Sequence, residues 1–313
     1  MAGSGATLSA LPRAAILRAA DSPLLQWLVR RYGMRLGAAR FVAGETLDEC
    51  VAVLRGLNEA GFHANTTLLG EAIPDPTGAS AVVAEYERIL DRIVAERLLA
   101  NVALKLTHLG LSFDEEHAYS NVAHVVAHAG GLGSFVRMDM EQSMYVDATL
   151  RVYERLRGAG HETVGTVLQS YLRRSPEDLE RLLPLEPNLR IVKGAYLEPA
   201  AIALPEKRDV DSAFVRLVER ALRAGAYIAV ATHDERIIRH VQAFVAREGI
   251  GGDRFEFQLL YGVRPALQRL LVSEGHKVLV ATPFGPDWYP YFMRRLAERP
   301  ANLLFFVRSL VRR

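Results

Sequence analysis

Residues 291–299, YFMRRLAER, carry a polar stripe where an amphipathic helix usually has an apolar one. At positions i, i+3, i+4 and i+7 of a helix, this stripe holds Tyr291, Arg294, Arg295 and Glu298. Two adjacent guanidiniums can bind a carboxylate with a paired geometry that a lysine does not offer. The stripe therefore suggests a site for a small carboxylic acid. Taken alone, it fits slightly better an ion pair between Arg294 and Glu298 on a solvated face.

The overall charge of the chain does not suggest a general electrostatic affinity for nucleic acid. The 313 residues include 38 Lys and Arg against 36 Asp and Glu, a net charge of +2, and both signs are spread along the chain. We therefore expect no binding of nucleic acid. The single cysteine, Cys50, excludes a disulfide framework or a zinc site of several cysteines and suits a reducing compartment. Its place among apolar residues at helical spacing predicts a buried thiol.

We expect a cytoplasmic protein, because no apolar run approaches the ~18 residues of a membrane span. The C-terminal sequence ANLLFFVRSLVRR mixes large apolar side chains with arginines. It could form a peripheral contact on the inner face of the membrane, although packing against the domain is the more common outcome for such a segment.

The elements that would position the arginines repeat from about residue 60 onward. Each repeat has an amphipathic helix, a glycine near its end, a short apolar run and a polar cluster, as in EAGFHANTTLLGE, GAGHETVGTVLQ, RAGAYIAVATHDE and SEGHKVLVATPFG. Glycine suits a helix C-terminus, and β-branched runs suit strands. The eight strand candidates are NTTLLG, ALKLTHL, SFVRMDM, VGTVLQS, LRIVKGAY, YIAVATH, FEFQLLYG and KVLVATPFG.

Eight alternating strands and helices predict a closed (βα)8 TIM-like barrel over residues 61–313. An open doubly wound sheet has the same local pattern, but no G-x-G-x-x-G follows any of the strands. Residues 1–60 stand outside this count and are predicted to form an N-terminal helical appendage.

In a parallel barrel, the C-terminal ends of the strands face one common mouth. The polar residues at these ends are Lys105, Asp139, Gln169, Arg190, Lys193, Tyr196, His233, Asp234 and Gln258. A Schiff-base lysine, as in an aldolase, is an alternative role for Lys105 or Lys193. Metal binding by the sequence THDE is not expected, because consecutive strand residues alternate between faces.

Five of these segments together closely resemble the proline dehydrogenase family in its monofunctional bacterial form. They are VALKLTHLG, RIVKGAYLEP, ATHD, FEFQLLYG and YFMRRLAER, in this order, and the similarity extends from about residue 60 to the C-terminus. The resemblance implies a distorted (βα)8 barrel and an FAD-dependent oxidoreductase that converts L-proline to pyrroline-5-carboxylate and passes electrons to a membrane quinone. A Schiff-base aldolase and a barrel that binds a carboxylate without turnover remain the alternatives.

The resemblance also implies a role for each matching residue. Lys105, Arg294 and Arg295 would bind the proline carboxylate, and Glu298 would hold the arginines. Tyr291 and Leu260 would form walls of the proline site, with Asp139 supporting it from the side. Arg190 would lie near flavin N5. The other residues expected to hold FAD are Gln169, Val192, Lys193, Gly194, Ala195, Tyr196, Thr232, His233 and Gln258.

The chain departs from the family pattern at Ala281. The family usually has a tyrosine two residues before its P-[YF]-G turn, and here Ala281 precedes the sequence TPFG. That tyrosine lines the substrate pocket. The choice between proline and a related cyclic amino acid such as hydroxyproline therefore stays open.

Overall fold

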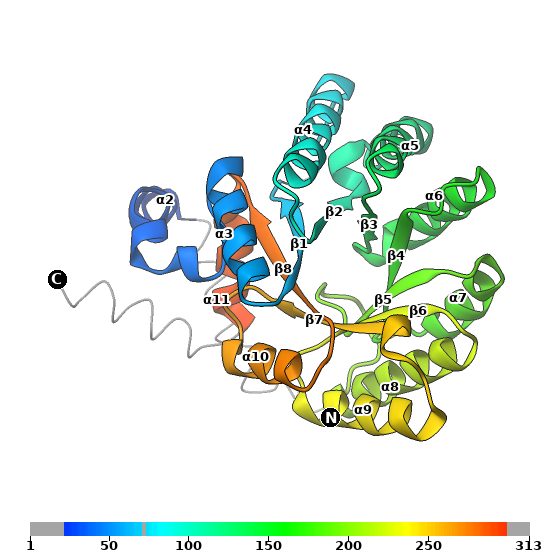
Figure 1. The fold of residues 1–313 in the computed structure, drawn as a ribbon. Helices are drawn as coiled ribbons and strands as arrows, with labels where there is room; N and C mark the ends of the chain where they lie inside the picture. The colour runs from blue at the N-terminus through cyan, green and yellow to red at the C-terminus, as the bar shows by residue number, and fades with distance from the viewer. Residues whose placement is uncertain (1–21, 71–72, 299–313) are drawn as a thin grey trace, which may run out of the picture.

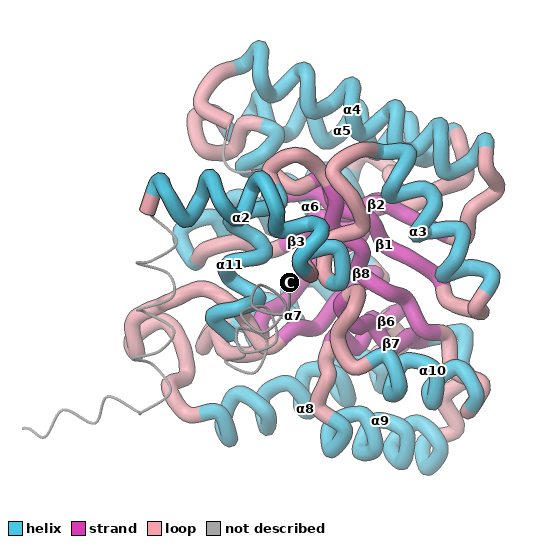
Figure 2. Tube along the Cα trace, turned by 90° about the vertical axis from the view of Figure 1, so that its left-hand side faces the viewer, coloured by secondary structure: helices cyan, strands magenta, loops and turns pink. Residues whose placement is uncertain are grey.

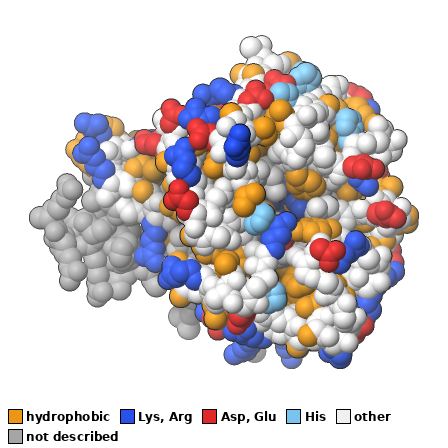
Figure 3. Space-filling model, in the orientation of Figure 1, with side chains coloured by type: hydrophobic (Ala, Val, Ile, Leu, Met, Phe, Trp, Pro, Cys, Tyr) orange, Lys and Arg blue, Asp and Glu red, His pale blue; other side chains and the backbone are white. Residues whose placement is uncertain are grey.

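The computed structural model describes residues 22–70 and 73–298. The C-terminal segment considered as a membrane contact lies outside these residues. Within the described part, no helix is both long enough and apolar enough to cross a membrane. Basic and acidic side chains are interspersed over the face shown in Figure 3, in keeping with the small net charge.

Eight parallel strands close into a barrel in which each strand pairs with its neighbours in sequence and the last pairs with the first. The strands are β1 (His63–Leu68), β2 (Ala100–Lys105), β3 (Val136–Asp139), β4 (Val164–Gln169), β5 (Asn188–Val192), β6 (Tyr227–Ala231), β7 (Phe255–Leu260) and β8 (Val278–Phe284). Each overlaps one of the eight predicted runs. The predicted (βα)8 barrel is therefore confirmed.

Helices surround the strands on the outside of the barrel (Figure 1). They are α4 (Pro76–Ala95), α5 (Glu115–Gly131), α6 (Val146–Gly158), α7 (Ser175–Leu182), α8 (Lys207–Arg223), α9 (Glu235–Glu248) and α10 (Pro265–Ser273). Helix α11 (Trp288–Glu298) follows β8 and lies at one end of the barrel (Figure 2). Short 3-10 turns occur at η2 (Leu106–Leu109), η3 (Ser143–Tyr145), η4 (Leu183–Leu185) and η5 (Gly252–Arg254).

Side chains at the helix starts explain where two of these helices begin. The Asp75 carboxylate accepts a hydrogen bond from the Gly78 N–H, 2.9 Å away, at the start of α4. Asp114 accepts from the His117 N–H at 2.7 Å and starts α5 in the same way. Each carboxylate satisfies an N–H group that has no partner within its own helix.

The N-terminal part forms α2 (Pro23–Leu36), η1 (Ala38–Arg40) and α3 (Leu47–Glu59). Helix α3 packs on β1 and β8, and Leu54 and Cys50 are fully buried in the same core as the barrel strands. Burial raises the pKa of the Cys50 thiol to about 12, which agrees with the predicted buried thiol. The domain boundary near residue 60 stays a prediction.

Helix α2 supports α11, the helix that carries the two arginines. The two helices lie side by side at one end of the barrel (Figure 2). Trp288 is 1% exposed, and a Cβ atom on Gly33 would lie only 2.7 Å from its ring. The Trp288 indole N–H also donates to Glu45 Oε1 at 2.5 Å. Together with the buried Phe292, these contacts fix which side of α11 faces the protein.

Candidate active site

A cavity of about 1210 Å³ opens at the C-terminal ends of the strands. Residues from β2 to β8 and from α11 line it, as the barrel architecture predicts for a functional site. The predicted site residues in its wall are Lys105, Asp139, Gln169, Arg190, Val192, Lys193, Gly194, Ala195, Tyr196, Thr232, His233, Gln258, Leu260 and Arg295. Ala281, where the sequence departs from the expected pattern, also lines the cavity.

Lys105 and Asp139 lie side by side at the ends of β2 and β3. The two residues are direct partners in the parallel register, so their side chains leave the sheet on the same face. Both line the cavity. A cation and an anion are thus present on one side of the mouth.

Arg190 comes from the middle of β5 and is only 8% exposed. Its Nη1 atom donates to Asp139 Oδ1 at 2.6 Å, and its Nη2 atom donates to Asn65 Oδ1 at 2.9 Å. The Nε–H is buried and finds no acceptor among the described residues. The guanidinium is therefore held by two protein partners and retains one buried donor.

Among the residues that the structure describes, Gln169, at the end of β4, has a buried acceptor without a donor, whereas Arg190 has a buried donor without an acceptor. Its side-chain amide donates to the carbonyl oxygens of Glu141 at 3.2 Å and Met140 at 3.4 Å. Its Oε1 atom is buried, with no donor bonded to it in the described part of the chain. Unpaired buried polar atoms are rare in proteins, and they often indicate a ligand that completes the hydrogen bonding.

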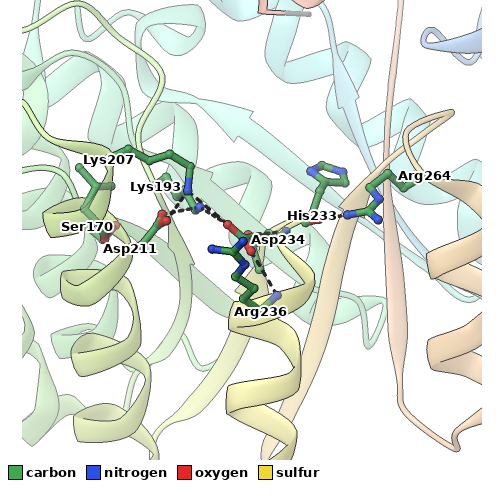
Figure 4. Close-up of polar contacts among 10 residues, drawn as sticks. Ser170, Lys193, Lys207, Asp211, His233, Asp234, Arg236 and Arg264 are labelled. Atoms are coloured by element: carbon green, nitrogen blue, oxygen red, sulfur yellow. Dashed lines mark hydrogen bonds and ion pairs between the residues drawn. The ribbon is translucent and has the colours of Figure 1, made fainter.

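Lys193 belongs to a cluster of charges at the edge of the cavity. Figure 4 shows its ammonium between two carboxylates, with Nζ 2.5 Å from Asp211 Oδ1 and 3.1 Å from Asp234 Oδ2. Lys207, at the start of α8, contacts the same two carboxylates. Burial alone would raise the pKa of Asp211 and Asp234. The two lysines, joined at Asp234 by the Arg236 N–H, outweigh burial and lower both pKa values.

His233 ties the end of β6 to the end of β7. Its Nε2 atom accepts a hydrogen bond from the Leu260 N–H at 2.9 Å, and both residues line the cavity. The Arg264 guanidinium donates to the His233 carbonyl at 2.8 Å, as Figure 4 shows. The backbone at this part of the wall is therefore held by side chains.

Gly194 follows Lys193 in the sequence KGAY and has a φ of +114°, which L side chains rarely adopt. A Cβ atom at this position would lie 2.2 Å from the Tyr171 ring, which also lines the cavity. The turn therefore needs glycine both for its backbone angle and for the close approach of Tyr171.

The structure separates the two adjacent arginines of α11. Arg295 lines the cavity together with Lys105, and its guanidinium lies 5.3 Å from the centroid of the Tyr291 ring. Arg294 is exposed and is not part of the cavity wall. Its charge nevertheless reaches the cavity, since it partly offsets the rise in the pKa of Tyr196 that burial and nearby carboxylates cause.

Two predicted site residues lie outside the cavity wall or outside the described part of the chain, and one buried carboxylate was not predicted. Tyr291 is half-buried beside Arg295 and lies outside the cavity wall, and the Glu298 side chain lies outside the described part of the chain. Glu141 was not predicted from the sequence. It is 4% exposed and accepts hydrogen bonds from the Thr107 N–H at 3.1 Å and the Thr107 hydroxyl at 2.6 Å. Because Thr107 follows Lys105 by two residues, Glu141 fixes the chain beyond that lysine.

The chain matches known proteins over nearly its whole length. It is 44% identical over 306 residues to a proline dehydrogenase of Deinococcus radiodurans, which covers 96% of this chain and 98% of that protein. It is 41% identical over 284 residues to proline dehydrogenase 1 of Bacillus subtilis (strain 168), with coverage of 91% and 94%.

A solved structure has the same fold. The crystal structure of proline utilization A (PutA) from Bdellovibrio bacteriovorus aligns with a TM-score of 0.79 and 23% identity, over 87% of this chain and 34% of that one. At this identity the match supports the fold alone. The family described as proline dehydrogenase matches residues 50–308. Taken with the two relatives, this match shows that the chain belongs to the proline dehydrogenase family.

Proposed function

We propose that the cavity at the barrel mouth binds FAD and L-proline together, so that the chain carries out the oxidation of proline to pyrroline-5-carboxylate with a bound flavin. Family membership makes the chain an oxidoreductase of proline catabolism. It decides against the two alternatives, a Schiff-base aldolase and a barrel that binds a carboxylate without turnover. The observation that carries the assignment of the site is that Lys105, Arg190 and Arg295 line one cavity.

The cavity wall fits a flavin in its hydrogen-bonding groups. Arg190 Nε is a buried donor without an acceptor in the described part of the chain, and Gln169 Oε1 is a buried acceptor without a donor there. The polar edge of an isoalloxazine ring offers both acceptors and an N–H donor. With Gln258, Thr232 and His233 also in the wall, the ring would be bound mainly by the ends of β4 to β7.

The edge of the cavity fits the charged part of FAD. Lys193, Lys207, Arg236 and Arg264 are among the residues that line it. Cations of this kind suit a diphosphate. The volume of about 1210 Å³ exceeds the roughly 300–1,000 Å³ of a typical ligand pocket, which leaves room for a dinucleotide and a small amino acid. The backbone of Val192, Gly194, Ala195 and Tyr196 would complete the cofactor site.

The side chains around the cavity would orient the substrate and stabilise charge. When bound, the flavin supplies the acceptor for the hydride that leaves the ring carbon beside the proline nitrogen. Arg295 and Lys105 would fix the proline carboxylate, with Arg294 adding positive charge, so that this ring carbon is held in one place. Leu260 and Tyr291 would limit movement of the ring. The Arg190 cation would favour the negative charge that a flavin takes on when it is reduced.

A membrane quinone is the proposed electron acceptor, which agrees with a cytoplasmic protein that contacts the inner face of the membrane. This part of the proposal rests on the resemblance to the family. Activity with a soluble quinone analogue, compared with activity in the presence of oxygen alone, measures the preference. Faster turnover with oxygen than with the quinone would contradict it.

The absorption spectrum of the purified protein tests the cofactor and the substrate in one experiment. We expect a yellow protein whose flavin absorbance bleaches when L-proline is added without oxygen, and which keeps its colour with D-proline. The same assay with hydroxyproline measures the effect of Ala281 on substrate choice. A colourless protein, or a flavin that proline does not bleach, would reject the assignment.

A further inference from the structure

We propose that Asn65 is a positioning residue that sets the orientation of Arg190 and, as a neutral acceptor, adds no negative charge beside it. The inference rests on the proposed function, because it concerns the guanidinium placed near flavin N5. Asn65 was not among the residues that the sequence indicated, and it does not line the cavity. Its side chain is 1% exposed, inside the barrel.

The hydrogen bonds of Asn65 allow only one orientation of its amide. The Nδ2 atom donates to Asn101 Oδ1, and the Oδ1 atom accepts from Arg190 Nη2 at 2.9 Å. Asn65 and Asn101 are direct partners in the register of β1 and β2, so the two amides face each other across the strands. Since Arg190 Nη2 can only donate, Asn65 must direct its oxygen at the guanidinium and its NH₂ group at the Asn101 oxygen.

The two acceptors on Arg190 restrict its guanidinium plane. Asp139 Oδ1, on β3, accepts a hydrogen bond from Nη1, and Asn65 Oδ1, on β1, accepts one from Nη2. A planar fork held at both Nη atoms cannot turn about its long axis without breaking one bond. The buried Nε–H, which has no acceptor in the described part of the chain, then keeps a fixed direction.

The chemical identity of the second acceptor matters as much as its position. Within residues 22–70 and 73–298, Asp139 is the one carboxylate in an ion pair with Arg190. Arg190 and Asp139 together carry no net charge, so a second carboxylate at position 65 would make this buried group net negative, in a place where charge interactions are strong. The neutral amide of Asn65 holds Nη2 without adding a negative charge, which would disfavour the negatively charged reduced cofactor.

The flavin reduction potential measures this role directly. In Asn65→Asp the shape is kept and a negative charge is added, so we expect reduction of the bound flavin to become at least tenfold less favourable, a shift of about 30 mV for a two-electron couple. In Asn65→Leu the Nη2 acceptor is lost. There we expect kcat to fall at least tenfold with little change in the KM for proline, because the carboxylate-binding residues are untouched.

Asn188 provides the matched control. It lies at the start of β5, and its Oδ1 atom accepts a hydrogen bond from the buried Arg137, so it is also an asparagine bound to an arginine within the barrel. Asn188→Asp makes the same change two residues before Arg190 in the sequence. We expect this variant to keep the wild-type potential.

An unchanged potential in folded Asn65→Asp, or a shift as large in Asn188→Asp, would overturn the inference. If neither Asn65 variant folds, Asn101→Leu takes their place. Asn101 is only half-buried, and its loss removes the acceptor that anchors the Asn65 NH₂ group, so that the oxygen bound to Arg190 Nη2 is no longer held in place. We expect kcat to fall there as in Asn65→Leu, and a wild-type kcat would overturn the inference.

The wild-type protein separates this inference from the proposed function. If it binds no flavin, the proposed function fails and the inference fails with it. If it binds flavin, and proline bleaches that flavin, but the reduction potential is the same with Asn and with Asp at position 65, only the inference fails.

Discussion

The Nζ atom of Lys193 lies 2.5 Å from Asp211 Oδ1, a contact that joins the end of β5 to helix α8. Asp234, the N-cap of α9, holds the same ammonium from the other side at 3.1 Å. A lysine held between two carboxylates is poorly placed to attack a carbonyl, so the contact argues against a Schiff-base role. It instead fixes the end of β5, which forms part of the cavity edge.

Asp211→Asn should therefore weaken FAD binding without removing it. The substitution takes one charged partner from Lys193 and from Lys207, and a typical hydrogen bond contributes about 0.5–1.5 kcal/mol, or roughly 2- to 10-fold in affinity. The dissociation constant can be measured by quenching of flavin fluorescence. Asp209→Asn on the same helix is the control, because Asp209 is 47% exposed and lies 3.6 Å from Arg208. Equal effects of the two variants would speak against the role of Asp211.

Arg295→Met should damage proline binding more than Arg294→Met. Arg295 lines the cavity beside Lys105, whereas Arg294 is exposed and outside the cavity wall. Hydrogen bonds to charged groups contribute about 1.5–3 kcal/mol, which predicts a rise in KM of roughly 10- to 100-fold for Arg295→Met with FAD still bound. The smaller effect expected of Arg294→Met follows from its place outside the wall. Steady-state kinetics with a dye acceptor would distinguish the two, and a larger effect at Arg294 would contradict the geometry.

The sequence predicted the barrel because several strands have a local signal, a short apolar run after a glycine at a helix end, as in β1, β4, β6 and β8. It predicted the cavity wall because polar residues at parallel strand ends share one mouth. Helical spacing could not separate Arg294 from Arg295, since both lie on the same stripe. Arg295 lines the cavity and Arg294 does not because Trp288 and Phe292 pack α11 against the N-terminal helices in one orientation.

Asn65 and Glu141 were missed for a different reason. Each is a single polar residue in an otherwise ordinary segment, and neither has a local pattern. Their partners are distant in sequence, with Arg190 lying 125 residues after Asn65 and Thr107 lying 34 residues before Glu141. Asn65 and Arg190 meet across the closed barrel, and Thr107 and Glu141 meet because β2 pairs with β3.

Glu141→Ala should destabilise the protein and disturb Lys105. The change leaves the Thr107 N–H and hydroxyl without their buried acceptor, at a cost of about 1–3 kcal/mol per unsatisfied group. Denaturant unfolding measures the stability, and a raised KM for proline would report the displaced Lys105. Glu116→Ala is the control. Its carboxylate is 72% exposed and pairs with Arg155 at the surface, where an ion pair contributes at most about 1 kcal/mol. If Glu141→Ala lowers the free energy of unfolding no more than Glu116→Ala does, the role of Glu141 is refuted.

Buried His108 should make the protein less stable in mild acid. His108 follows Lys105 by three residues and is 5% exposed. Burial first, and then the positive charge of Lys105, lower its pKa from 6.5 to about 4. The unfolded chain therefore binds the proton more readily than the folded chain. Stability is complete above about pH 6.5 and falls as the pH drops from 6.5 toward 4.

The slope of stability against pH isolates this histidine. A single group contributes up to about 1.4 kcal/mol per pH unit between its two pKa values. Urea unfolding of the wild type and of His108→Gln at pH 7, 6 and 5 gives the slopes. We expect a shallower slope in His108→Gln, because glutamine binds no proton in this range. His161→Gln, at a partly exposed position between α6 and β4, should keep the wild-type slope. Identical slopes in all three proteins would mean that His108 takes up its proton as easily in the folded chain as in the unfolded one.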